Sequence, residues 1–310
     1  MGQYTGQTWT VGEPGSDDFW VFDSEKVARW FQVCRSVHPM ILGSVARDDG
    51  NFFLTPEERD EVLKKEPGLA KFIRQCYGSY EFINNVTRYC FWLVDASPAE
   101  IKHSRILYER VKRVKEFRLA SKRGATQKHA ETPHLFSEIR QPTTNYLLIP
   151  SVSSHKRQYI PMGYVSPDVI VTNLAFALPY ATPYHLAILT SRVHMAWMRV
   201  VCGRLGISYR YSNTIVYNNF VWPKSSPHQV MKITATGGKI LTARAKYTDS
   251  SYADLYDEVS MPLDLRKAHR ENDAAVLEAY GFPADIDEMG IVSRLMEMYN
   301  EKLAEVDGRK

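Results

Sequence analysis

Residues 146–171 read YLLIPSVSSHKRQYIPMGYVSPDVIV, and this stretch decides the fold class. Short aliphatic, aromatic and β-branched runs alternate with Pro, Gly and Ser, which is the composition of strands divided by turns. The runs are ten residues or less apart, a spacing that predicts a sheet of antiparallel type. We expect strands at 146–149, 158–160, 162–165 and 169–171. The polar turn 151–157 carries Lys156 and Arg157 near its end, and loops held on a rigid sheet often recognise partners.

Helices are predicted in the sequence both before and after these strands. Thr55-Pro56-Glu57-Glu58 and Ser97-Pro98-Ala99-Glu100 each place a hydroxyl at the N-cap, Pro in the first turn and Glu at the third helical position, so each starts a helix. The second of these helices is expected to run to about residue 121. Thr182-Pro183 opens another over 183–205. Residues 88–95 (RYCFWLVD) predict a buried strand between the first two helices.

Composition divides the chain into three segments. Residues 1–35 begin with a glycine-rich stretch and are interpreted as a leader or the remnant of a linker, although residues near Val27 and Phe31 fit a short helix. Residues 36–224 hold the predicted sheet, and residues 225–310 are acidic and rich in helix-forming residues. The sequence therefore predicts an α+β protein with a mixed, mainly antiparallel sheet and flanking helices, followed by a small all-α C-terminal domain.

Several classes of protein are disfavoured by what the sequence lacks. No apolar run approaches the roughly 20 residues that a membrane-spanning helix needs, and the N-terminus has no signal-peptide pattern, so we expect a cytoplasmic protein without a membrane partner. The four cysteines form no C-x-x-C pair, and no metal site is expected. The sequence also lacks a glycine-rich phosphate loop, a G-x-S-x-G motif and an Asn/Asp-Pro-Pro-aromatic tetrapeptide. We expect this chain to catalyse nothing by itself, with an unfamiliar active site as the alternative.

Charge is concentrated in the middle of the chain. Residues 1–101 carry ten Lys and Arg against fifteen Asp and Glu, residues 102–224 carry eighteen against five, and residues 225–310 carry eleven against fifteen. Residues 102–128 alone hold ten cations and two carboxylates. A basic region between acidic flanks is typical of proteins that bind a polyanion such as DNA. A solvated basic face over a tyrosine-rich core would have the same composition.

Seven strings that follow one another along the chain carry a family resemblance. They are Leu54-Thr-Pro-Glu-Glu-Arg59, Glu81-Phe-Ile-Asn84, Arg118-Leu-Ala-Ser-Lys122, Glu131-Thr-Pro-His-Leu-Phe136, Glu138-Ile-Arg-Gln-Pro142, His194-Met-Ala-Trp197 and Val216-Tyr-Asn-Asn-Phe-Val-Trp-Pro223. Together they resemble the C-terminal third of MmeI-like enzymes, which are Type II restriction–modification proteins and related adenine-N6 DNA methyltransferases. The resemblance covers about residues 36–300. It implies a DNA target recognition domain over 36–224 and a helical C-terminal domain over 225–310.

The resemblance also implies which residues contact DNA. In this family the turn after the helix that matches 183–205 contributes base-reading side chains, so we expect base contacts from Gly206, Ser208, Tyr209, Arg210 and Asn218. Relatives often carry charged residues at the positions of Gly206 and Ser208, and this departure bears on which base is read. Arg210 is expected to form a bidentate contact with guanine, the alternative being an ion pair or a phosphate contact. Tyr209 could instead pack inward. The residues expected to hold DNA phosphates are Lys122, Arg123, Lys128, Lys156 and Arg157.

These observations lead to one functional hypothesis and one alternative. The chain is expected to be the sequence-specific double-stranded DNA recognition module of an adenine-N6 methyltransferase or restriction–modification enzyme of a bacterium or archaeon, acting at the nucleoid. S-adenosylmethionine would then bind to a methyltransferase domain or subunit outside this chain. The alternative is an assembly subunit whose basic face binds an acidic partner domain.

Overall fold

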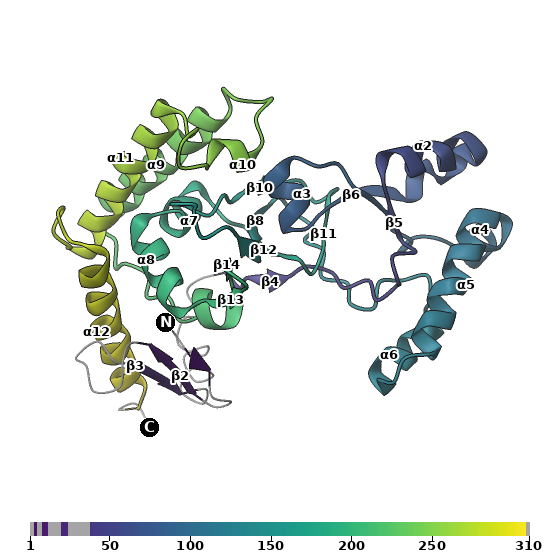
Figure 1. Cartoon of the computed structure of the whole chain (residues 1–310), viewed down its shortest axis with the longest axis horizontal. Helices are drawn as coiled ribbons and strands as arrows, with labels where there is room; N and C mark the ends of the chain where they lie inside the picture. The colour runs from purple at the N-terminus through teal and green to yellow at the C-terminus, as the bar shows by residue number, and fades with distance from the viewer. Residues whose placement is uncertain (1–2, 5–7, 12–19, 24–37, 308–310) are drawn as a thin grey trace.

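The computed structural model describes Gln3–Tyr4, Thr8–Val11, Trp20–Asp23 and residues 38–307. Along the long axis of the molecule, helices gather at two ends and most of the strands lie between them (Figure 1). Three strands at the N-terminus, β1 (Gln3–Tyr4), β2 (Thr8–Val11) and β3 (Trp20–Asp23), form a small antiparallel sheet. The short helix expected near Val27 and Phe31 lies outside the described residues.

The central sheet confirms the antiparallel arrangement expected from the sequence. Its order is β10 (Gly163–Val165), β8 (Tyr146–Pro150), β12 (Ala175–Pro179) and β4 (Ile41–Leu42), with every neighbouring pair antiparallel. Ile149 of β8 lies opposite Phe176 of β12. All five residues of β8 are buried, because the sheet is covered on both faces.

Residues 158–160, which were expected to form a strand, do not form one. Tyr159 and Ile160 are buried, but by packing against the C-terminal helices rather than by strand pairing. The Tyr159 ring stacks on His269 with centroids 4.2 Å apart, and its hydroxyl donates to Asp273 Oδ2 at 2.6 Å. The apolar composition of residues 158–160 therefore predicts correctly that Tyr159 and Ile160 are buried, but wrongly that they form a strand.

Two smaller sheets complete the β-structure. One has the order β11 (Ile170–Val171), β6 (Ile73–Tyr77), β7 (Tyr89–Phe91) and β5 (Phe53–Leu54), and β7 is the buried strand expected within 88–95. The β11–β6 pair is parallel, the only such pair among the described strands. The other sheet has the order β13 (Gly203–Leu205), β14 (Ser208–Arg210) and β9 (Val152–Ser153).

The helices between β4 and β8 are α2 (Pro56–Lys65), α3 (Ser79–Asn84), α4 (Pro98–His103), α5 (Arg105–Leu119) and α6 (Gly124–Lys128), with 3₁₀ turns η1 (Pro67–Phe72) and η2 (His129–Glu131). Two of them, α2 and α4, begin where the capping boxes predict. Both capping boxes are complete, at Thr55 and at Ser97. The single helix expected over 98–121 is broken, because the Ser104 hydroxyl caps a new helix by accepting from the Leu107 amide at 3.0 Å.

The helix expected over 183–205 is likewise divided, into α7 (Pro183–Leu189) and α8 (Arg192–Val201), and its last residues form β13. Two hydroxyls make the break. Thr190 Oγ1 donates to the Leu186 carbonyl at 2.7 Å, and Ser191 Oγ donates to the Ile188 carbonyl at 2.7 Å. Side chains of this kind compete with backbone helix bonds, so a helix ends and restarts at them. A π-helical turn, η3 (Asn213–Tyr217), follows β14.

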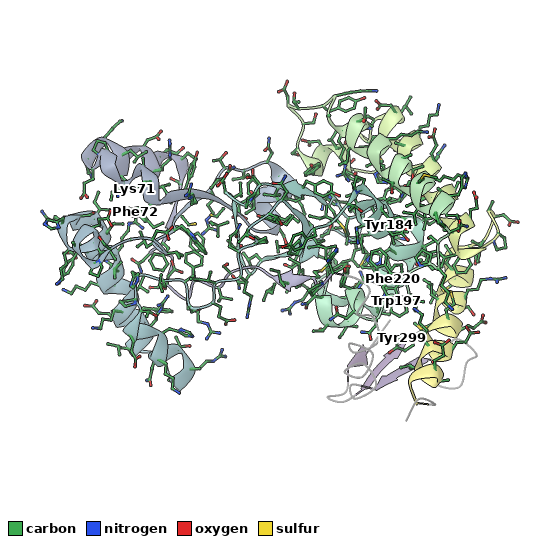
Figure 2. The ribbon with its side chains drawn as sticks, turned by 180° about the vertical axis from the view of Figure 1, so that it is seen from behind. Lys71, Phe72, Tyr184, Trp197, Phe220 and Tyr299 are labelled. Carbon is green, nitrogen blue, oxygen red and sulfur yellow. The ribbon has the colours of Figure 1, made fainter. Side chains whose placement is uncertain are left out.

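The C-terminal helices share a core with α7 and α8. They are α9 (Pro227–Arg244), α10 (Tyr252–Leu255), α11 (Leu263–Tyr280) and α12 (Glu288–Asp307). A Cβ on Gly237 would lie 2.4 Å from the Pro183 carbonyl oxygen, so only glycine allows α9 to approach α7 this closely. Trp197 lies 6.2 Å from Tyr299 and 6.4 Å from Phe220, measured between ring centroids (Figure 2). Residues on both sides of position 224 therefore belong to one hydrophobic core.

Candidate nucleic-acid interface

Helices α4 to α6 form a basic surface at one end of the molecule (Figure 1). Its cations are exposed, and none forms an ion pair with a residue that the structure describes. They are Lys102, Arg105, Lys112, Arg113, Lys115, Lys122, Arg123 and Lys128. Lys122 and Arg123 immediately precede α6, and Lys128 is its last residue. The structure thus places three of the five expected phosphate-binding residues at exposed positions at the two ends of α6.

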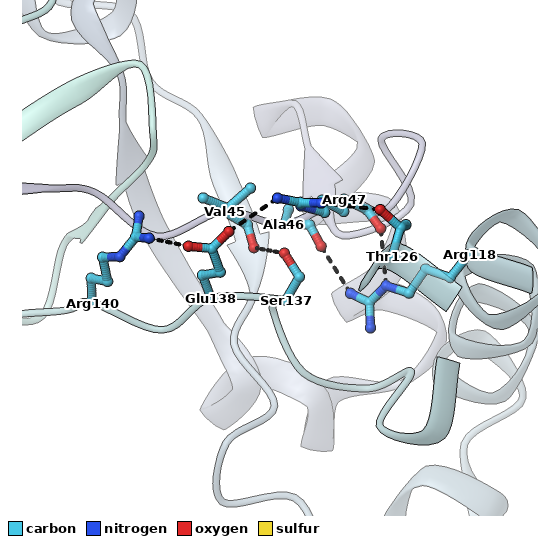
Figure 3. A network of polar contacts seen from close by, with 8 residues as sticks. All are labelled: Val45, Ala46, Arg47, Arg118, Thr126, Ser137, Glu138 and Arg140. Atoms are coloured by element: carbon cyan, nitrogen blue, oxygen red, sulfur yellow. Dashed lines mark hydrogen bonds and ion pairs between the residues drawn. The ribbon is translucent and has the colours of Figure 1, made fainter. Parts of the chain in front are cut away.

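Arg118 is one of the ten cations of residues 102–128, but it does not face solvent. Its side chain is fully buried, with 0% of its surface exposed. The guanidinium donates to five carbonyl oxygens at 2.7 to 3.1 Å, as Figure 3 shows in part. These carbonyls belong to Ala46, Arg47, His129, Thr132 and Leu135. Arg118 therefore holds three segments of backbone together and is not available to DNA.

A second network holds α6 to the strands. Arg47 donates to Thr126 Oγ1 at 3.0 Å and to Glu138 Oε1 at 3.1 Å, and Arg140 pairs with the other oxygen of the same carboxylate (Figure 3). Two cations thus share Glu138. These arginines belong to the framework that fixes the basic surface, whereas the cations of that surface remain unpaired among the described residues.

A short hairpin forms the second part of the candidate interface. Strands β13 and β14 are joined by Gly206 and Ile207, and Gly206 has φ +59°, a conformation that favours glycine. The tip is exposed: Leu205 and Ile207 show 57% and 75% of their surfaces. Arg210 is also exposed and forms no ion pair within the described part of the chain. The hairpin thus presents apolar and cationic side chains to solvent around a glycine turn.

Tyr209 supports the hairpin from beneath. Its side chain is buried, with 6% of its surface exposed, and the Arg204 guanidinium lies 4.2 Å from its ring centroid. This placement favours the inward-packing alternative, and a base contact by Tyr209 stays a prediction. The sequence did not single out Arg204, because the expected helix ran through it to residue 205. Its place two residues before Gly206 was the signal that could have identified it.

Lys156 and Arg157 follow β9, the strand that pairs with β14. Lys156 is exposed, whereas Arg157 is half-buried and donates through Nη1 to Ser153 Oγ at 3.3 Å. Burial lowers the pKa of Arg157, although the negative charge of Asp257 opposes that change. Both residues line a cavity of about 360 Å³ between the 155–159 loop, α8 and the loop before α11. Lys156 is therefore the better placed of the two for a phosphate.

The remaining candidates have different surroundings. Ser208 lies in β14 and is half-buried, and Gly206 has open space where a Cβ would project. Asn218 follows η3, and its side-chain nitrogen is buried without a hydrogen-bond partner among the described residues. The structure therefore groups Gly206, Ser208 and Arg210 on one hairpin, whereas Asn218 belongs to a separate element.

Buried histidines are structural in this region. Burial lowers the pKa of His194 to about 3, and its Nε2 lies 2.9 Å from the Tyr211 hydroxyl. Across residues 38–305, no three His, Cys, Asp or Glu side chains come together as metal ligands. No helix in the described part of the chain is both long and apolar enough to cross a membrane.

Two family models together match most of the chain. The model described as "MmeI, target recognition domain" matches residues 25–224, and that described as "MmeI, C-terminal domain" matches residues 225–306. DNA methyltransferase A of Bacillus subtilis (strain 168) is 35% identical over 264 residues, which are 84% of this chain and 30% of that protein.

A solved structure confirms the fold. The Type IIL restriction–modification enzyme MmeI in complex with DNA superposes with a TM-score of 0.84 at 41% identity, over 87% of this chain and 36% of that chain. The mixed α/β architecture with its helical C-terminal region is therefore that of the corresponding part of MmeI. The chain spans about a third of the length of each of these two relatives.

Proposed function

The chain belongs to the MmeI target recognition domain family over residues 25–224 and to the MmeI C-terminal domain family over 225–306, and from this premise we propose that it reads a specific double-stranded DNA sequence for a restriction–modification enzyme. The observation that carries the proposal is the set of exposed cations on α4–α6 and on the β13–β14 hairpin, which form no ion pair with any residue that the structure describes. A duplex is a dense polyanion, and cations without protein carboxylates nearby can replace its counterions.

We propose that the two surfaces divide the work of recognition. Lys122, Arg123 and Lys128, together with Lys156, would hold phosphates and fix the register of the duplex. The hairpin would enter a groove, because a two-stranded ribbon fits the major groove of B-DNA. Arg210 would then donate to a guanine edge, with Ser208 and the backbone at Gly206 close to neighbouring bases. The Arg204 guanidinium, held on the Tyr209 ring, would limit how the hairpin tilts.

Catalysis would take place outside this chain. The relatives are a DNA methyltransferase and a restriction–modification enzyme about three times as long. S-adenosylmethionine would require a cofactor crevice, which α/β enzymes form at the carboxyl ends of parallel strands. The described strands are antiparallel apart from the two-residue β11–β6 pair, so they do not fit this group. A methyltransferase domain or subunit would bind the methyl donor, and DNA reading would place the protein at the nucleoid of a bacterial or archaeal cytoplasm.

A binding experiment with a randomised duplex library tests the proposal. Wild-type protein should bind duplex DNA, with affinity falling by orders of magnitude between low and moderate salt. Arg210→Ala should relax preference at one base pair by about 1–3 kcal/mol. Lys156→Ala should weaken binding to all duplex sequences alike and reduce the salt dependence of that binding by about one counterion.

A matched control for these variants is Lys239→Ala, since Lys239 already pairs with Glu271 at 2.6 Å. It should leave DNA binding unchanged. A DNA affinity that does not change with salt concentration would contradict the whole proposal. Uniform weakening by Arg210→Ala would contradict only the assignment of the hairpin to base reading.

A further inference from the structure

An apolar groove of about 560 Å³ runs along α5, between α4 and residues 133–134. Its lining includes Ile101, Tyr108, Val111, Leu119 and Pro133. The large side chains are open to solvent: Tyr108 shows 50% of its surface and Leu119 shows 54%. Exposed apolar patches of this kind mark interaction sites on folded proteins.

The groove exists because the apolar stripe of α5 is wider than the part of it that is buried. Leu107, Val114 and Arg118 form the buried face, which packs against the rest of the molecule. Val111 is half-buried and packs against the same core, and Tyr108 and Leu119 extend the stripe beyond it, where the described structure leaves the groove uncovered. A surface helix ordinarily carries polar residues beyond the stripe that it buries. The exposed Tyr108 and Leu119 therefore require a separate explanation.

The rim of the groove is cationic. Lys102, Lys112 and Lys115 line it, and the structure gives them no ion pair with any described residue. Glu116 is the only carboxylate in the lining. A suitable occupant therefore has apolar side chains for the floor and negative charge at its edges. Duplex DNA supplies the charge but not the apolar side chains, and it would leave Tyr108 and Leu119 against hydrated sugar and phosphate.

We propose that this groove binds an acidic amphipathic helix of a protein partner. Such a helix would place apolar residues at i, i+3 or i+4, and i+7 on the floor, and carboxylates beside the lysines. The exposed side chains of the site, Tyr108 and Leu119, do not belong to the buried face of α5. The same region would then bind a protein partner through the groove and its lysine rim, and DNA through Lys122, Arg123 and Lys128.

Selection from a phage-displayed library of helical peptides tests this proposal on the full chain. The selection is run with saturating duplex DNA present, and the enriched peptides are then measured by fluorescence anisotropy. They should carry net negative charge and apolar residues at helical spacing. Tyr108→Asp and Leu119→Asp, at two different positions along α5, should each weaken their binding by about tenfold or more. Val259→Asp, at a position 92% exposed and outside the groove, should change it less than about twofold.

A charge swap sharpens the test. Lys112→Glu should weaken the binding of the acidic peptides. A peptide with one acidic residue replaced by Lys should restore binding to that variant. Near-ultraviolet circular dichroism checks that each variant is folded, and both groove positions are exposed enough to accept a polar side chain.

Four results would overturn the proposal. These are no enrichment, an enriched pool that is neutral or basic, equal binding to Tyr108→Asp, and displacement of the peptides by added duplex. Loss of a wild-type dimer in Tyr108→Asp, seen by sedimentation, would assign the groove to a second copy of the chain instead.

Discussion

Three lysines of the C-terminal region and the exposed cations of α4–α6 are in opposite situations. Each of the three, Lys232, Lys239 and Lys246, pairs with a carboxylate of α11. These lysines hold the pKa values of Glu278, Glu271 and Asp264 below their ordinary range. On α4–α6, eight exposed cations have no such partner among the described residues.

From this comparison we propose that pairing, and not the number of cations, separates a binding surface from a solvated one. Exposed ion pairs contribute only about 0–1 kcal/mol to stability, so the pairs on α9–α11 change the local potential more than the fold. Unpaired cations retain their full attraction for phosphates. Both regions also contain buried charged residues that depart from this pattern. They are Arg118 in α4–α6, and Arg244 and Asp273 in α9–α11.

The largest effect is expected at Arg118. Arg118→Met should lower the free energy of unfolding by about 3–5 kcal/mol, because five backbone carbonyls lose their donor in a buried site. Urea unfolding followed by circular dichroism measures it. Lys112→Met, on the exposed side of the same helix, should stay within about 0.5 kcal/mol. Equal losses in the two variants would remove the distinction between framework and surface on α5.

Asp273 provides the next test, through pH. Burial raises the pKa of Asp273 to about 6 from an ordinary value of 3.8, even though Tyr159 and the Arg192 amide donate to it. The folded state therefore holds the proton more tightly, so this carboxyl's contribution to stability is greatest below about pH 4 and is lost as pH rises through about 6. Relative to Asp273→Asn, the wild type should lose up to about 3 kcal/mol across that range. Denaturant titrations at several pH values measure it, and parallel curves for the two proteins would contradict the assignment.

A triple substitution tests the comparison itself. Combined Lys122→Ala, Arg123→Ala and Lys128→Ala should weaken duplex binding by about ten- to a hundredfold at low salt and lower the salt slope by about 2.7. The matched control combines Lys232→Ala, Lys239→Ala and Lys246→Ala, which removes the same charge from paired positions. Fluorescence anisotropy at several salt concentrations distinguishes them. Similar losses in both triple variants would mean that net charge alone, and not pairing, determines binding.

The smallest effect concerns a single surface pair. Lys239→Ala should lower the free energy of unfolding by less than about 1 kcal/mol, since both members of the pair with Glu271 are solvent-exposed. Thermal melting measures it. A loss of several kcal/mol would show that the pairs on α9–α11 hold the helices together and do more than neutralise their surface.

The sequence predicted well those features of the fold that depend on residues close together in the chain. The capping boxes at Thr55 and Ser97 fix helix starts within four residues, and the strand at Tyr146–Pro150 follows from a continuous buried run. The same reasoning failed where a hydroxyl inside an apolar helical pattern restarts the helix, at Ser104 and at Thr190-Ser191. A serine at such a position can either face solvent or cap, and the sequence pattern does not distinguish the two.

The candidate site was predicted in part for the same reason. Charge distribution and the family strings pointed to residues 102–128 and to the turn at Gly206, and both form exposed surfaces. Arg118 could not be separated from Lys115 by sequence, because its five acceptors come from segments 11 to 72 residues away. The pairing of β14 with β9, which places Arg210 opposite Val152 in the segment that leads to Lys156, is also a long-range contact.

The sequence by itself determined the class of the protein, the starts of its first helices, its central strands and the excess of positive charge in its middle third. These depend on neighbours within a turn or a strand. The tertiary structure alone decided which cations are buried, paired or free, and that helices on both sides of position 224 share one core. Burial and pairing depend on groups far apart in the chain, so they are fixed only when the chain folds.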